Sequence, residues 1–227
     1  MKPSRRNIRK LGRSRASREP RQGFVLFCEG LNTEVEYFKA IRRIYSSTLI
    51  DWEIHRGVGV PYTIAEKAIE KAKSLGLTRH SRRRKDSYEE NDQVWAVFDR
   101  DDHPRFEEAV ANCETANVKV AQSNPCIELW LILHEQEFHR NEHRHEMQRI
   151  LAVLRPEYDP SGSKTPDCDD IVKRVEEAER RSEKLLQRRV DDGNAYGNPS
   201  TTVGRLTREI REAHAQSSRP IGPSTVP

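Results

Sequence analysis

Residues 94–103 read VWAVFDRDDH, in which an apolar run leads directly into Asp99, Asp101 and Asp102. A short apolar run of this kind is typical of a strand that is buried on both faces of a parallel sheet. An Asp-x-Asp pair at the end of such a strand can direct two carboxylate oxygens at one divalent cation. The segment alone is equally compatible with a solvated acidic turn, because Asp often accepts hydrogen bonds from the backbone of its own turn.

Strand and helix patterns alternate on both sides of this segment. Apolar runs predict strands at 23–28, 50–55, 94–98 and 118–121. Helical spacing predicts helices at 33–45, 61–75, 104–116 and 125–134, followed by surface helices at 142–154 and 169–189. Strands that alternate with helices imply right-handed crossovers. The sequence therefore predicts an α/β fold with a central parallel sheet of about four strands, helices on both faces, and additional C-terminal helices.

Helix starts are predicted from local capping rules. Thr33 and Glu36 have the spacing of a capping box. Asn124 and Pro125 have the residue types favoured at a helix cap and at the first helical position. The segment 198–201 is expected to begin the last helix by capping, or alternatively to dock beside the metal site.

Charge is distributed unevenly along the chain. Residues 1–21 hold nine Lys or Arg and one Glu, a local balance of +8, so the remainder of a chain with net charge +4 is close to −4. We predict a flexible basic tail at 1–22, which either adds salt-sensitive affinity for nucleic acid or serves solubility alone. An α/β domain at 23–140, a helical extension at 141–214 packed on the same domain, and a disordered tail at 215–227 complete the expected organisation.

Two further observations concern the setting of the protein. The chain lacks an apolar stretch of the roughly 18 residues needed to cross a bilayer, and its N-terminus lacks the apolar region of a secretory signal. We therefore expect a cytoplasmic protein that does not interact with membranes. The four cysteines form no CxxC pair, which favours buried reduced thiols over a zinc site or a disulfide framework.

The polar candidates gather where the predicted strands end. They are Glu29 and Gly30 after the first strand, the three aspartates after the third, and Ser123, Asn124 and Glu128 around the end of the fourth. Because the carboxyl ends of parallel strands lie along one edge of a sheet, we expect these residues to meet. Clustered carboxylates repel one another unless they are protonated or bridged by a cation. The edge is therefore predicted to bind Mg²⁺ or Mn²⁺.

These motifs resemble those of the Toprim domain of topoisomerases, primases and OLD-type nucleases, in which Glu-Gly follows a first strand and Asp-x-Asp a third. The blocks FCEGLNTEVEYFKAI, VWAVFDRDDH, AQSNPCIELWLILHE and GNPSTTVGRL extend the likeness over residues 23–210. Together they resemble the RloB family, which is encoded near type I restriction systems and is linked to antiviral defence. The resemblance implies a Toprim-like, Rossmann-like catalytic domain at 23–140.

The resemblance also implies roles for individual residues. Glu29 would be the general acid or base, and Asp99 and Asp101 would hold the metal. Glu34 is either a further metal ligand or a favourable charge in the first turn of a helix. Asp102 either coordinates the metal or stays solvated.

Three other residues are assigned by weighing their surroundings. Glu128 lies one turn into an apolar helix, where a carboxylate is costly unless it faces the site edge, so we assign it to the site. Lys164 lies in Gly-Ser-Lys-Thr, but the earlier glycine of a nucleotide-hydrolysing phosphate-binding loop is missing, so we reject that role. The RloB resemblance makes Lys164 a candidate contact to a phosphate group. His134 ends a helix, where a positive imidazole would suit the helix dipole.

Among the activities of Toprim proteins, that of a small nuclease suits this length, because topoisomerases and primases need additional domains. We expect metal-dependent hydrolysis of phosphodiester bonds in DNA or RNA, in an effector of phage defence. The family resemblance suggests an ATPase encoded nearby as partner, and the sequence leaves open the oligomeric state and the number of metal ions. One alternative is a non-catalytic module that binds nucleic acid or a partner through a Toprim-like metal site. Another is a haloacid-dehalogenase-type phosphatase, in which the Asp-x-Asp normally follows the first strand.

Overall fold

The computed structural model describes residues 22–47, 50–78, 92–100, 103–162 and 165–218. Asp101, Asp102 and Lys164 lie outside the described residues, as do the basic segment 1–21 and the last nine residues, 219–227. The sequence-based predictions for these positions therefore remain predictions.

A single, mostly parallel sheet forms the centre of the molecule, with strand order β2-β1-β3-β4-β5. The parallel strands are β1 (Gln22–Cys28), β2 (Ile50–His55), β3 (Gln93–Asp99) and β4 (Lys119–Asn124). A fifth strand, β5 (Ser200–Thr201), pairs antiparallel with the end of β4. The predicted α/β class and the four parallel strands are confirmed. The sequence analysis missed β5, because two residues are too few to show an alternating pattern.

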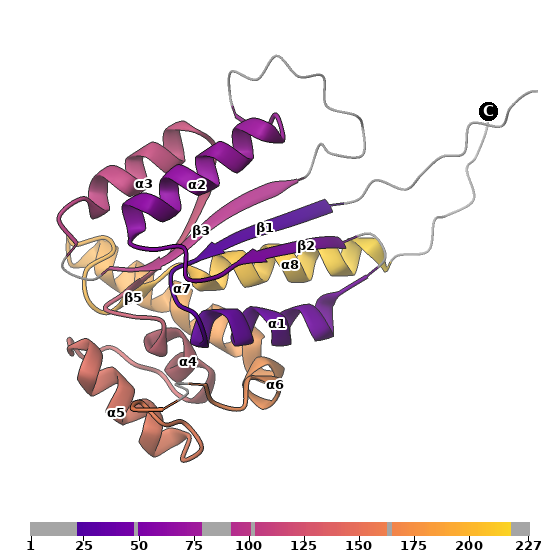
Figure 1. The fold of residues 1–227 in the computed structure, drawn as a ribbon. Coiled ribbons are helices and arrows are strands. Elements are labelled where there is room, and N and C mark those ends of the chain that lie inside the picture. The colour runs from indigo at the N-terminus through magenta and orange to yellow at the C-terminus, as the bar shows by residue number, and fades with distance from the viewer. Residues whose placement is uncertain (1–21, 48–49, 79–91, 101–102, 163–164, 219–227) are drawn as a thin grey trace, which may run out of the picture.

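Helices cover both faces of this sheet (Figure 1). The helices α2 (Pro61–Ser74) and α3 (Phe106–Thr115) pack on one face against alternate residues of β1 and β3, among them Val25 and Phe98. The helix α1 (Thr33–Tyr45) packs on the opposite face, where Leu26 and Val97 point. Because side chains alternate along a strand, Asp99 follows Val97 onto the α1 face. All four cysteines are buried and free of disulfides, as the sequence predicts.

Further helices extend the layer on the α1 face. They are α4 (Glu128–Glu135), α5 (Arg144–Leu154), α6 (Cys168–Ile171), the 3₁₀ turn η1 (Val172–Arg174), α7 (Val175–Asp191) and α8 (Val203–Ser217). The predicted surface helix at 169–189 is thus divided into α6, η1 and α7, and α7 packs on α4 and α8 through buried residues such as Leu185. Within the described part of the chain, no helix combines the length and the apolar character needed to cross a membrane.

The predicted helix starts are wrong in detail. Thr33 is the first residue of α1 and does not cap it, and Glu36 pairs with Lys39 at 2.7 Å. Asn124 is the last residue of β4, where it pairs with Ser200, and α4 begins only at Glu128. In the second case strand pairing holds the backbone extended at the position where the local capping rule expects a helix to begin.

The start of α8 shows the same effect. Ser200 and Thr201 form β5, and the helix begins at Val203. The predicted capping role holds only for Thr201, whose Oγ1 accepts a hydrogen bond from the Val203 N–H at 3.3 Å. Ser200 pairs with Asn124 in the sheet, and Asn198 Nδ2 donates to the Glu142 carbonyl.

Gly204 marks the closest approach of α8 to its neighbours. A Cβ atom at this position would lie 3.2 Å from Trp130 Cζ3 and 3.3 Å from the Glu179 Cα, and it would overlap the Ser182 hydroxyl. We expect Gly204→Ala to lower the free energy of unfolding by about 1–2 kcal/mol, because overpacking outweighs the higher helix propensity of Ala. Urea unfolding measures this, with the exposed Gln216→Ala on the same helix as control. If Gly204→Ala were as stable as the wild type or more stable, α8 would be able to shift away from α4 and α7 at little cost in free energy.

Candidate active site

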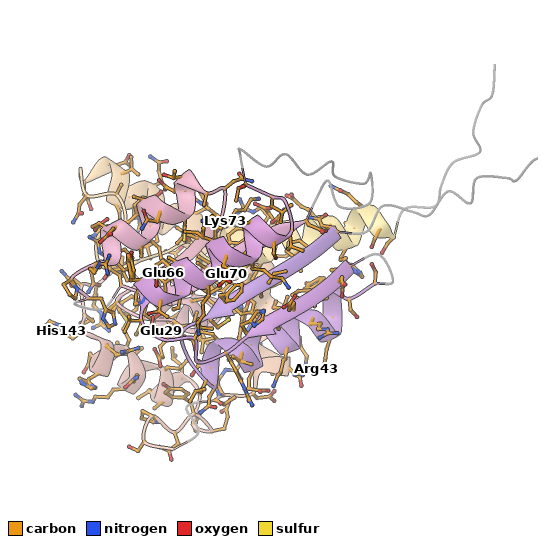
Figure 2. The ribbon with its side chains drawn as sticks, turned by 45° about the horizontal axis from the view of Figure 1, so that its top comes forward. Glu29, Arg43, Glu66, Glu70, Lys73 and His143 are labelled. Atoms are coloured by element: carbon orange, nitrogen blue, oxygen red, sulfur yellow. The ribbon has the colours of Figure 1, made fainter. Side chains whose placement is uncertain are left out.

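Four carboxylates from separate elements line one open cavity of about 320 Å³ at the carboxyl end of the sheet. They are Glu29 directly after β1, Glu34 in the first turn of α1, Asp99 at the end of β3 and Glu128 at the start of α4. Glu34, Asp99 and Glu128 are almost fully buried, at 5%, 3% and 3% exposure. Figure 2 shows Glu29 at the end of the molecule that also carries His143, whereas Arg43 lies toward the other end of α1.

Glu29 and Asp99 are tied together through the backbone. The Asp99 N–H donates to Glu29 Oε2 at 3.1 Å, and the Glu29 N–H donates to the Val97 carbonyl at 3.1 Å. His103 Nε2 lies 3.8 Å from the other Glu29 oxygen. The end of β3 therefore holds Glu29 in a fixed place beside Asp99, with one carboxylate oxygen turned toward His103.

Gly30 shapes the path between β1 and α1. Its N–H donates to Glu34 Oε1 at 3.2 Å, and a Cβ atom at this position would overlap the Glu34 carboxylate. A residue without a side chain is thus required for Glu34 to fold back over the loop. Gly30 therefore acts by allowing the Glu34 carboxylate to take its place in the cavity.

Three residues that follow α4 contact the carboxylates of the cavity, and the sequence analysis missed them: Arg144 and Gln148 also line the cavity, whereas Tyr158 only contacts Glu128. Arg144 Nη2 donates to Asp99 Oδ2 at 2.9 Å. Glu128 Oε1 accepts hydrogen bonds from the Tyr158 hydroxyl at 2.8 Å and from Gln148 Nε2 at 3.3 Å. Among the described residues, no group donates to Glu128 Oε2. The sequence indicates these partners only indirectly: a buried carboxylate needs hydrogen-bond donors, but the sequence does not show which residues supply them.

The carboxylates perturb one another. Burial, with the charges of Glu128 and Glu29 added, raises the pKa of Glu34 to about 7, although the backbone N–H groups of Glu34 and Gly30 oppose the shift. Burial raises the pKa of Asp99 well above its ordinary value, and Glu34 and Glu128 raise it further, whereas Arg144 opposes them. The folded protein therefore resists placing full negative charge on all of these groups at once.

The donor set fits a hard divalent cation. Carboxylate oxygens are the ligands that Mg²⁺ and Mn²⁺ favour, and Glu128 Oε2 is a buried oxygen that lacks a described hydrogen-bond donor. In the described residues, no three His, Cys, Asp or Glu side chains already form a metal-ligand group. Arg144 instead contacts one oxygen of Asp99. A cation at Asp99 would consequently use Oδ1 or take the place of the guanidinium.

Ser123 and Asn124 lie near the cavity but do not line it. The Ser123 hydroxyl is 2.9 Å from the Thr201 hydroxyl, and Asn124 Nδ2 donates to the Tyr196 carbonyl at 2.9 Å. Both side chains thus attach the segment around β5 to the end of β4.

His134 corrects a sequence-based interpretation. It is fully buried, its Nδ1 donates to the Trp130 carbonyl at 2.9 Å, and its Nε2 accepts from the Tyr37 hydroxyl at 3.2 Å. Burial, with added repulsion from nearby arginines, lowers its pKa to about 3. The imidazole is therefore neutral, and the expected positive charge at the end of α4 is wrong.

The chain was compared with known proteins. A family model described as RloB: RloB-like protein matches residues 24–210. Comparisons with curated proteins and with experimentally determined structures returned no match. The matched segment begins in β1 and ends in α8, so it includes all four carboxylates of the cavity.

Proposed function

The chain belongs to the RloB-like protein family, and we propose that it is a metal-dependent nuclease that hydrolyses phosphodiester bonds. The observation that carries the proposal is the convergence of Glu29, Glu34, Asp99 and Glu128 in one cavity. Burying like charges together is costly for folding alone, and a divalent cation removes that cost. The convergence is thus better explained by a metal site than by structural stability.

The cation, Mg²⁺ or Mn²⁺, would be held by Asp99 with Glu34, and Asp101 and Asp102 are further candidate ligands. When bound, it would neutralise charge that develops on the phosphate group. Glu128 lies beside Asp99 and Glu34 in the cavity, and the Tyr158 and Gln148 hydrogen bonds fix the position of its carboxylate.

Glu29 would transfer the proton. Its side chain is 20% exposed in the cavity. A hydrogen bond from the Asp99 N–H at the end of β3 holds its carboxylate in place. A carboxylate in that position can take a proton from the attacking water or protonate the leaving oxygen. Arg144, whose side chain is 40% exposed, would meet a phosphate oxygen with a charge-assisted hydrogen bond.

The proposed substrate is DNA or RNA, and the proposed setting is phage defence together with an ATPase encoded nearby. Both proposals are based on membership of the RloB-like family. The second candidate function is a non-catalytic module that binds nucleic acid or a partner. The contact between Arg144 and Asp99 favours it, because the guanidinium already occupies one of the Asp99 oxygens that a cation would use.

A cleavage assay tests the proposal. Single-stranded and double-stranded DNA and RNA would be incubated with the full chain in Mg²⁺, Mn²⁺ or EDTA, with and without the neighbouring ATPase. We expect metal-dependent cleavage that Glu29→Gln lowers by roughly 100- to 10,000-fold. Glu146→Gln is the matched control, since Glu146 lies on the outside of α5 and pairs with Arg149. Binding of nucleic acid without cleavage in any condition would establish the non-catalytic module instead.

A further inference from the structure

A larger cavity, of about 720 Å³, lies along the edge of the sheet formed by β4. Arg100, the residue after Asp99, lines it, together with Lys119 and Gln122 of β4. Its aromatic lining comes from β3, α3 and the loop after α7, namely from Trp95, Phe106 and Tyr196. The end of β3 thus contributes consecutive residues to two cavities, and the second has a volume typical of small-molecule sites.

We propose that this second cavity binds a nucleobase of the substrate strand, next to the phosphate group that enters the carboxylate cavity. The proposal rests on the function proposed above, because it assigns a subsite to the same nucleic-acid substrate. Three features of the lining support it: a buried hydrogen-bond acceptor, a neutral charge balance and an exposed aromatic ring.

The acceptor belongs to Gln122. Gln122 lines the cavity, it is only 7% exposed, and no described residue donates a hydrogen bond to its Oε1. A buried amide oxygen without a donor is costly, so its presence in a cavity lining points to a donor supplied by a ligand. Nucleobases carry such donors as ring N–H and exocyclic amino groups on their hydrogen-bonding edges.

The charges around the cavity favour a base over a phosphate. Three cationic and three anionic side chains line it: Arg100, Lys119, Arg205, Glu107, Glu114 and Glu209. Arg100 pairs with Glu107, and Lys119 pairs with Glu209. These pairs leave little net positive charge for an anion, whereas an uncharged planar base needs none.

Tyr196 supplies a surface for stacking. Tyr196 is 39% exposed and lines the cavity, and its carbonyl accepts hydrogen bonds from Arg100 Nη1 at 3.3 Å and from Asn124 Nδ2 at 2.9 Å. The backbone of Tyr196 is therefore anchored to the ends of β3 and β4. Proteins that bind single strands commonly stack bases on such aromatic rings.

The binding of short fluorescently labelled single strands of DNA and RNA, measured by anisotropy in EDTA, tests the proposal without any cleavage. We expect Tyr196→Ala to weaken binding roughly 10-fold or more, and Tyr196→Phe to restore it, because the stacking face remains. Gln122→Met, which keeps the length of the side chain but removes the acceptor, should also weaken binding. Tyr45→Ala, at the far end of α1, is the control and should bind as the wild type does.

Tryptophan fluorescence locates the bound base. Trp95 lines the cavity, so binding should change its emission, and the change should disappear in Trp95→Phe. Wild-type affinity in both Tyr196→Ala and Gln122→Met would overturn the proposal, as would a fluorescence change that persists in Trp95→Phe. Binding of nucleoside monophosphates with no binding of oligonucleotides would also overturn it, since the cavity would then serve a free nucleotide. If Tyr196→Ala and Gln122→Met bind oligonucleotides normally and still cleave them in Mg²⁺, the nuclease proposal stands and only the assignment of the nucleobase to this cavity fails.

Discussion

Asp99→Asn is expected to lower metal-dependent cleavage by roughly 1,000-fold or more while the protein stays folded. Asparagine has nearly the same shape but cannot carry the negative charge that holds a divalent cation. Loss of metal-assisted charge stabilisation is worth several kcal/mol, and each 1.36 kcal/mol changes a rate tenfold. Initial rates in Mg²⁺ across a range of metal concentrations would measure the effect.

The stability of the same variant should not fall. Burial and the neighbouring Glu34 and Glu128 raise the pKa of Asp99, and their combined effect outweighs the attraction of Arg144. The folded state therefore disfavours the Asp99 charge at neutral pH, and removing that charge should leave the melting temperature unchanged or higher. Loss of activity without loss of stability separates a functional role from a structural one.

Asp169→Asn is the matched control for this experiment. Asp169 forms an exposed ion pair with Arg43, far from the cavity, and exposed pairs contribute little to stability. It should cleave and melt as the wild type does. Cleavage by Asp99→Asn at the wild-type rate would remove Asp99 from the proposed metal site.

The parallel sheet could be predicted from sequence because its signals are local. Apolar runs such as 23–28 and 94–98 are typical of buried strands, and a parallel sheet places the strand ends on one edge. These rules suffice to place Glu29 near Asp99 despite the separation of the two residues in the chain. Glu128 could be assigned to the same edge because a carboxylate in an apolar helix needs a polar environment.

The missed features depend on contacts between distant segments. Arg144 lies at the polar start of the helix predicted at 142–154, and Tyr158 lies in the loop after it. No local rule indicates that these side chains reach Asp99 and Glu128. Asn124 satisfies a capping rule, yet pairing with Ser200 decides its conformation. Local rules fail where tertiary contacts supply the larger energy.

His134 illustrates the same conflict and yields the second large effect. A positive charge at a helix end gains about 1 kcal/mol from the dipole, whereas burial of a charged imidazole costs several times as much. The fold therefore keeps His134 neutral, with Nδ1–H directed to the Trp130 carbonyl.

The folded protein should become less stable in acid because of His134. Its pKa is about 3 in the folded state, against about 6.5 in the unfolded chain, so between these pH values only the unfolded state binds the proton. The stability contributed by neutral His134 is thus complete above pH 6.5 and declines as the pH falls toward 3. At pH 4 the loss corresponds to about 3 kcal/mol.

Urea unfolding of wild type and His134→Gln at pH 7 and pH 4 isolates this contribution. The variant will be less stable at pH 7, because glutamine cannot reproduce both hydrogen bonds, to Tyr37 and to Trp130, in a packed site. Its loss of stability between the two pH values should nevertheless be smaller than that of the wild type by about 3 kcal/mol. His145→Gln, which changes an exposed histidine of α5, should keep the wild-type difference. Equal acid sensitivity in His134→Gln and wild type would mean that His134 takes up its proton in the folded state, and that the buried end of α4 admits water.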